Sequence, residues 1–204
     1  MDKKTEILEY WFSGLNDQST LSTDMPQFRK WFGKAEKTDQ EIRDRFQGDW
    51  ELALGGKYSD WESTPQGTLA LVILLDQFPR NMFRDSAKAF SSDEMALKAC
   101  LNALKQDKDK DLTLVERMFL YLPLMHSESL DIQKKSMHYF SLLKAEVKDR
   151  FPQNQDFFNL NHEFAGKHYR IIDRFGHFPH RNDILGRPST AEEIEFLKGP
   201  DSSF

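Results

Sequence analysis

The chain of 204 residues is 39% hydrophobic and 13% aromatic, which is enough apolar material for the core of one packed domain and excludes disorder throughout. Its formal net charge of −5 argues against nucleic-acid binding, because proteins of that class usually present a basic face.

Apolar residues recur at helical spacing from the start of the chain, and the two-residue alternation of strands is hard to find. A first helix carries Ile7 and Trp11 on one face. Thr38 opens the capping box TDQE, so a second helix is expected to begin there and to end at the glycine pair 55–56. The segment 13–25 between them predicts a mobile surface loop or lid.

By periodicity alone, the run LALVILL, residues 69–75, could be a buried strand or a buried helix. The segment up to Phe78 is long for a strand, which favours a helix, and a helix apolar on all sides is a central one. Thr64 and Pro65 are typical of a helix start, and we expect the helix to stop at the Phe78-Pro79 pair. Capping boxes at Ser91, at Thr113 and at 189–193 mark further helix starts. The later helices are expected over 91–106, 113–122, 130–147, 164–175 and from 189 onward. The sequence thus predicts a single all-α domain, residues 1–204, built as an array or bundle of about eight helices.

Two segments about a hundred residues apart are similar in sequence. DQFPRN, residues 76–81, and GHFPHRN, residues 176–182, each present Phe-Pro followed by arginine and asparagine. If proline stops each helix, the two turns converge at one end of the bundle and offer guanidinium and amide groups to one anion. The alternative is that these side chains only bind exposed carbonyl groups at helix ends.

A third turn, LPLMHSESL, follows Pro123, which is expected to kink or end its helix. Helix capping accounts for Ser127 and Glu128 but not for His126, which titrates near neutrality beside a carboxylate and suits general acid–base work. The catalytic candidates are His126, Glu128, Asp76 and His180. The ligand-binding candidates are Arg80, Asn81, Arg174, His177, Arg181, Asn182 and Arg187.

The sequence gives little support for a metal site, a catalytic nucleophile or a nucleotide-binding site. The histidines and carboxylates lack a recognised metal-ligand spacing, and the chain contains neither a nucleophile elbow nor a nucleotide-binding glycine motif, so we expect no metal and no cofactor. His168 lies on an apolar stripe and is interpreted as a hydrogen-bonded core residue. Cys100, the single cysteine, is interpreted as a small core residue in a protein of a reducing compartment.

Four separated strings resemble the signatures of the bacterial family known as domain of unknown function 924: LLDQFPRNMFR, ERMFLYLPLMHSE, HYRIIDRFGHFPHRN and ILGRPSTAEEIEFL. The resemblance covers nearly the full chain. It implies an all-helical fold grouped with tetratricopeptide-like arrays, although no 34-residue repeat is visible, and it implies no particular activity. The signature positions that it adds to the candidate residues already named are Gln77, Arg117, Tyr121, Ser127, His168, Gly176, Pro179, Gly186, Ser189, Thr190 and Glu192.

Three functions remain open at this point. The first is a pocket for a small anionic ligand, with or without acid–base catalysis. The second is a tetratricopeptide-like module that binds an acidic peptide or another protein without catalysis. The third is a purely structural ionic network. The N-terminus lacks a signal-peptide pattern and no apolar run approaches the ~20 residues of a membrane span, so we expect a cytoplasmic protein without a membrane partner. The oligomeric state is left open.

Overall fold

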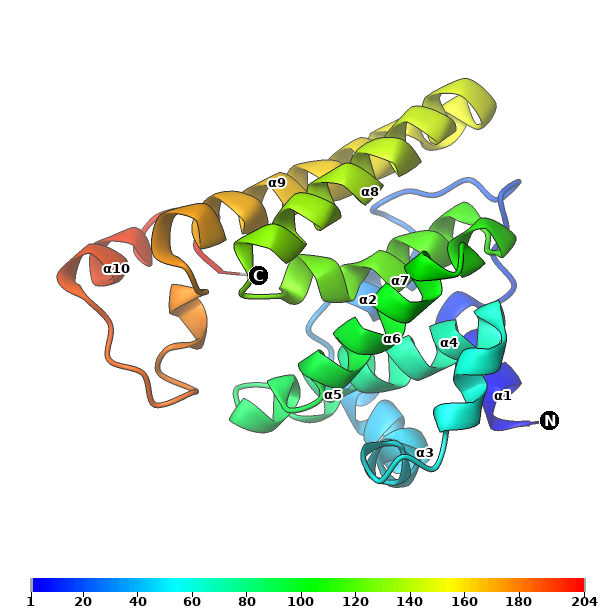
Figure 1. Ribbon diagram of the computed structural model, residues 1–204, viewed down its shortest axis with the longest axis horizontal. Coiled ribbons are helices and arrows are strands. Elements are labelled where there is room, and N and C mark those ends of the chain that lie inside the picture. The colour runs from blue at the N-terminus through cyan, green and yellow to red at the C-terminus, as the bar shows by residue number, and fades with distance from the viewer. Residues whose placement is uncertain (1, 204) are drawn as a thin grey trace.

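A computed structural model describes residues 2–203, and within them the chain forms helices and turns and no strand (Figure 1). The all-α prediction is confirmed. The α-helices are α1 (Lys3–Phe12), α2 (Pro26–Phe32), α3 (Glu36–Leu54), α4 (Pro65–Val72), α5 (Phe78–Met82), α6 (Asp93–Lys105), α7 (Leu114–His126), α8 (Leu130–Arg150), α9 (Gln155–Phe175) and α10 (Ala191–Phe196).

The later helices pack in chain order, α6 on α7, α7 on α8 and α8 on α9, while α4 lies centrally against α1, α6 and α7. Figure 1 shows α8 and α9 as a long pair on one side of the molecule, with α10 beyond the end of α9. The core is strongly aromatic: Trp11, Phe78 and Phe119 are buried and meet edge to face. A smaller apolar cluster, made of Ile171, Ile172 and Phe178, supports the segment between α9 and α10.

The central helix does not stop at its proline, contrary to prediction. A π-helical segment, Ile73–Gln77, joins α4 to α5, so the helix runs on through Pro79 to Met82. Proline cannot donate the backbone hydrogen bond that Leu75 O would normally accept. The hydroxyl of Ser92 donates to this oxygen instead, at 2.6 Å. The lost bond is therefore replaced from α6, and the helix continues.

Several predicted helix boundaries are confirmed. Thr64 accepts a hydrogen bond from Gly67 N at the start of α4, and α3 ends at the glycine pair. Thr113 and Thr190 open capping boxes for α7 and α10.

Other boundary predictions are wrong. Thr38 lies inside α3, which begins at Glu36, and α6 begins after Ser92, whose hydroxyl binds Leu75 O rather than its own helix. α7 continues three residues past Pro123 to His126. The mobility of segment 13–25 is not a boundary and stays a prediction; its Leu21 N donates to Asn154 Oδ1 at 2.8 Å.

No helix within residues 2–203 is long and apolar enough to cross a membrane. The cytoplasmic location and the tetratricopeptide-like grouping stay predictions.

Candidate functional site

Asp76 is the most deeply buried member of the predicted site. It lies on the π-helical segment, a form that often marks functional positions, and its side chain is fully buried. Its carboxylate meets His126 Nδ1 at 2.8 Å, Gln77 Nε2 at 2.6 Å and Arg80 Nη1 at 3.3 Å. Burial alone would raise the pKa of Asp76, but the positive charge of Arg80 and the contact with His126 outweigh it and lower the pKa. The carboxylate is therefore ionised at neutral pH.

His126, the last residue of α7, is oriented by this carboxylate. Burial and the charge of Arg80 lower the pKa of His126, although Asp76 opposes them, so the imidazole is neutral at pH 7. A neutral imidazole beside an ionised carboxylate carries its proton on Nδ1 and donates it to Asp76 Oδ1. Nε2 is then the basic nitrogen, and no hydrogen bond to it is found within residues 2–203. This is the geometry of an oriented general base.

Arg80 connects this pair to α6. Its guanidinium donates to both oxygens of Asp93, at 2.8 and 2.9 Å, and also to the backbone oxygen of Asp76 at 2.6 Å. Arg80 is thus well satisfied by its neighbours.

Arg181, on the segment between α9 and α10, approaches the carboxylate of Asp93 as well, but it has fewer polar partners than Arg80. It ends a short 3-10 helix, Pro179–Arg181, and only 7% of the residue is exposed. Its guanidinium lies 4.5 Å from the ring centroids of both Phe90 and Phe178, and its nearest carboxylate oxygen, on Asp93, is 3.5 Å away. No hydrogen bond from this guanidinium is found in the described chain, and Nε is buried without a partner. Burial and the neighbouring charge of Arg80 lower the pKa of Arg181 to about 10.

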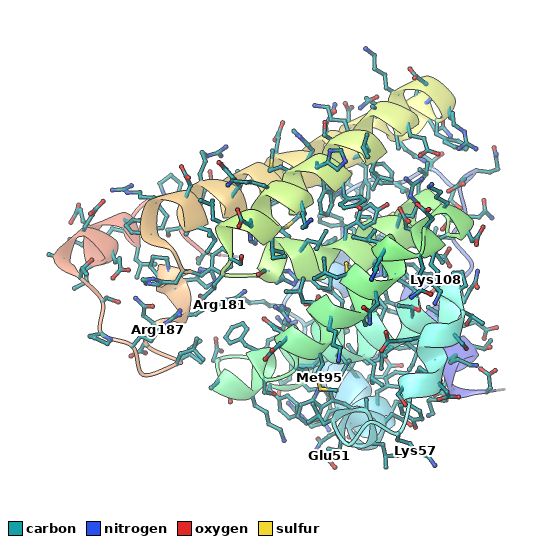
Figure 2. All side chains as sticks on the ribbon, in the orientation of Figure 1. Glu51, Lys57, Met95, Lys108, Arg181 and Arg187 are labelled. Atoms are coloured by element: carbon teal, nitrogen blue, oxygen red, sulfur yellow. The ribbon has the colours of Figure 1, made fainter. Side chains whose placement is uncertain are left out.

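Glu128, just after α7, binds the segment between α9 and α10. Its carboxylate accepts from Phe178 N at 2.9 Å and from both terminal nitrogens of Arg187, at 2.7 and 3.0 Å. Burial would raise the pKa of Glu128, but the bonds from Arg187 and Phe178 lower it. Figure 2 shows Arg181 and Arg187 on the segment that joins α9 to α10. Both oxygens are used by this contact, so Glu128 positions the turn.

Two further histidines, His180 and His168, lie beside Arg181 and His126. Burial and the charge of Arg181 lower the pKa of His180 to about 4, so it is neutral at pH 7. His168 is buried, and its Nδ1 lies 2.8 Å from Phe164 O, which confirms its interpretation as a hydrogen-bonded core residue. Its ring lies 6.2 Å from that of His126.

The structure thus brings together part of the predicted set. We call the following residues the polar cluster: Asp76, Arg80, Asp93, His126, Glu128, His180, Arg181 and Arg187. Asp93 and the ring of Phe90 were missed by sequence analysis. The only available signal for Asp93 was its place at the first position of a helix, where acidic residues are common for reasons unrelated to function.

Four predicted ligand-binding residues lie elsewhere. Asn81 donates to Asp39, which also binds Arg84, on the far side of the central helix. The others have partners close to the last helix: Arg174 binds Glu192, His177 contacts Glu193, and Asn182 donates to Ser189.

The two hollows described for the structure lie outside the polar cluster. One, of about 350 Å³, is lined by Asn81, Asp39 and Arg84. The other, of about 470 Å³, is lined by Arg174 and the end of α9. The polar cluster itself reaches solvent at a shallower surface, because the side chains of Arg80, Asp93 and His126 are 20%, 21% and 15% exposed. Within residues 2–203 no three histidine, cysteine or acidic side chains are grouped so that they could hold a metal ion.

Comparison with known proteins identifies relatives but no activity. The family model described as bacterial protein of unknown function (DUF924) matches residues 7–201. The solved structure of the protein of unknown function ATU0120 from Agrobacterium tumefaciens is similar, with 30% sequence identity and a TM-score of 0.77. The alignment covers 96% of this chain and 97% of that one. None of the curated proteins compared with the chain matches it.

Proposed function

This chain belongs to the DUF924 family of bacterial proteins, and we propose that it binds a small carboxylate or phosphate anion at Arg181, with the His126–Asp76 pair exchanging a proton with the bound ligand. The observation that carries the proposal is a guanidinium that is almost fully buried and yet makes no hydrogen bond in the described chain. Buried donors in proteins are normally paired, so the unpaired Nε and the single 3.5 Å contact of the guanidinium with Asp93 favour a ligand.

The charges of the polar cluster support a site for an anion. Within residues 2–203, Asp93 is the only carboxylate in ion-pair contact with Arg181, and it already accepts two hydrogen bonds from Arg80. Arg80 and Arg187 each have a bidentate carboxylate partner, whereas Arg181 has none. A planar carboxylate or a phosphate would supply that partner, because arginine binds both in a forked geometry.

The rings of Phe90 and Phe178 restrict what can reach this guanidinium. The centroid of each ring lies 4.5 Å from the guanidinium carbon, so both rings take up space around the donors of Arg181, which favours a compact ligand group. A small anion is therefore favoured over an acidic peptide.

The His126–Asp76 pair supplies the chemistry. The positive charge of Arg80 contributes to lowering the pKa of His126, and an anion bound nearby opposes that effect and raises the pKa. Binding is therefore coupled to proton uptake, and a ligand with an acidic C–H or O–H group meets a base whose orientation is already fixed by Asp76.

Calorimetric titration and thermal shift test the proposal at about pH 7. Sodium phosphate and sodium acetate are added to the wild-type protein, to Arg181→Met and to Arg29→Met, with sodium chloride at the same ionic strength as the blank. Arg29 is an exposed arginine outside the polar cluster and serves as the matched control. We expect at least one anion to bind wild type and Arg29→Met and to raise their melting temperature, since a ligand at 100 times its Kd adds about 2.7 kcal/mol to native-state stability.

Loss of this effect in Arg181→Met supports the proposal. Equal binding by Arg181→Met, or no effect of either anion beyond that of chloride, overturns it. Proton uptake is measured by repeating the titration in buffers of different ionisation enthalpy. We expect it to disappear in His126→Asn, whose amide preserves the hydrogen bond to Asp76 but cannot accept the proton.

A further inference from the structure

Residues of α9, of α10 and of the turn that follows α10 line a second hollow. Figure 1 shows where these two helices lie. The hollow has a volume of about 470 Å³, which falls within the range of small-molecule sites. One of its lining residues, Arg170, is two positions from His168 along α9, which places it on nearly the opposite face of the helix from the polar cluster. We call this hollow the α9–α10 pocket.

The floor of the α9–α10 pocket is apolar. Ile171 is buried, and the half-buried rings of Phe175 and Phe196 lie 5.0 Å apart at an angle of 53°. Two rings inclined to each other leave a concave apolar surface, and an aromatic group packs well against such a surface edge to face.

The rim of the pocket is basic. Lys167, Arg170 and Arg174 follow each other at spacings of three and four residues and so form one column on α9. Lys167 is paired with Asp201 at 2.7 Å, and Arg174 is paired with Glu192 and lies near the rings of both Phe175 and Phe196, at 4.7 and 5.6 Å from their centroids. Arg170 makes no hydrogen bond or ion pair to any residue from 2 to 203. Its guanidinium is therefore available at the edge of an aromatic floor.

From these features we propose that the α9–α10 pocket binds a small aromatic carboxylate. The ring packs on Phe175 and Phe196, and the carboxylate receives the forked donors of Arg170, while Lys167 and Arg174 add positive potential on either side. An inorganic anion would leave the apolar floor exposed to water, and a neutral aromatic molecule would leave Arg170 without a partner. Both halves of the ligand are therefore required. This site is independent of the one at Arg181.

Three probes separate the two requirements. 3-Phenylpropionate carries the ring and the carboxylate, 3-phenylpropanol carries the ring alone, and propionate carries the carboxylate alone. Each is titrated into the full chain and followed by saturation-transfer NMR. The variants are Arg170→Gln and the matched control Arg29→Gln, both of which replace an exposed arginine that has no side-chain hydrogen bond or ion pair in the described chain.

We expect 3-phenylpropionate to bind wild type and Arg29→Gln equally and to bind Arg170→Gln about tenfold more weakly, which is the loss of one good charged contact. 3-Phenylpropanol and propionate should each bind wild type no more tightly than 3-phenylpropionate binds Arg170→Gln. Equal binding of the acid to Arg170→Gln, binding of the alcohol as tight as that of the acid, or no saturable binding of the acid at about 1 mM would each overturn the proposal.

Discussion

Replacing Arg181 by methionine should leave the stability of the ligand-free protein nearly unchanged, although the residue is 7% exposed. Each pKa unit corresponds to about 1.4 kcal/mol, so a pKa of about 10, against the ordinary value for arginine, means that the fold holds this charge at a cost of about 3 kcal/mol. Because the lowered pKa is still well above 7, the side chain is charged in both the folded and the unfolded chain, and the cost is fully present at neutral pH.

Methionine removes that cost but also loses favourable contacts. The contacts of the guanidinium with Phe90 and Phe178 contribute about 2 kcal/mol at this desolvated position, whereas the attraction of Asp93 is already included in the pKa of about 10. A flexible thioether fills the space between the rings. The opposing terms leave a net change of about 1 kcal/mol or less, which corresponds to about 2–4 °C in melting temperature for a chain of this size.

Arg80→Met is the matched comparison because it removes an arginine of the same cluster that is fully bonded. It leaves the buried Asp76 without its strongest positive neighbour and removes both hydrogen bonds to Asp93. Breaking a buried ion pair by removing one partner costs about 3–5 kcal/mol, or roughly 10 °C in melting temperature here. Chemical and thermal denaturation of the two variants without added anions gives both values. Equal, large losses for Arg80→Met and Arg181→Met would refute the reasoning and make Arg181 a structural residue.

The remaining predictions concern pH, the late turn and the cysteine. Burial lowers the pKa of His126, His168 and His180, so the unfolded chain binds more protons below pH 6.5. The free energy of unfolding should therefore fall between about pH 6.5 and pH 5 by up to about 1.4 kcal/mol per pH unit for each histidine, and a flat profile in urea titrations would contradict this. Glu128→Gln removes a bidentate ion pair and should speed hydrogen exchange across residues 176–190 but not in α4 or α7; uniform acceleration would show that the contact supports the whole fold. Cys100 is fully buried, and burial raises the pKa of its thiol, so a thiol reagent should label it only on unfolding, whereas rapid labelling of the native protein would contradict its placement in the core.

The grouping of Arg80, His126 and Arg181 could be predicted in part from sequence because helix punctuation is local, although the segment at Arg80 continues as a helix and is not a turn. Glycine at 176 adopts a left-handed conformation, with φ of 74°, and ends α9 as its residue type indicates. The ends of packed helices then lie together, and side chains at those ends become neighbours. Asp76, Arg80, His126 and Arg181 were found this way.

The separation of Asn81 from Arg80 could not be predicted, because it depends on a hydrogen bond from another helix. If proline had stopped the central helix, the side chains of Arg80 and Asn81 would both point away from the core. Ser92 instead binds the carbonyl group left free by Pro79, and the helix continues. Successive helical residues are rotated by about 100°, so Asn81 faces Asp39 while Arg80 faces Asp93.

The ion pairs of Arg174 and His177 show a second limit of prediction from sequence. Arg174 and His177 looked like ligand-binding residues because cations are concentrated there in an acidic chain. Glu192 and Glu193, fewer than twenty residues further on, pair with them once α10 folds back beside α9. A charge pattern alone does not show whether its partners come from the same chain or from a ligand.

The side-chain Nε–H resonance of Arg181 tests the central claim most directly. Because this group is buried, it should exchange slowly enough with water to give an observable ¹H–¹⁵N signal, which Arg181→Met assigns by its disappearance. Titration of phosphate or acetate at constant ionic strength should shift that signal saturably and before the signals of exposed arginines. A resonance that stays unmoved through the titration, or that moves only in parallel with the exposed arginines, would contradict an anion site at Arg181.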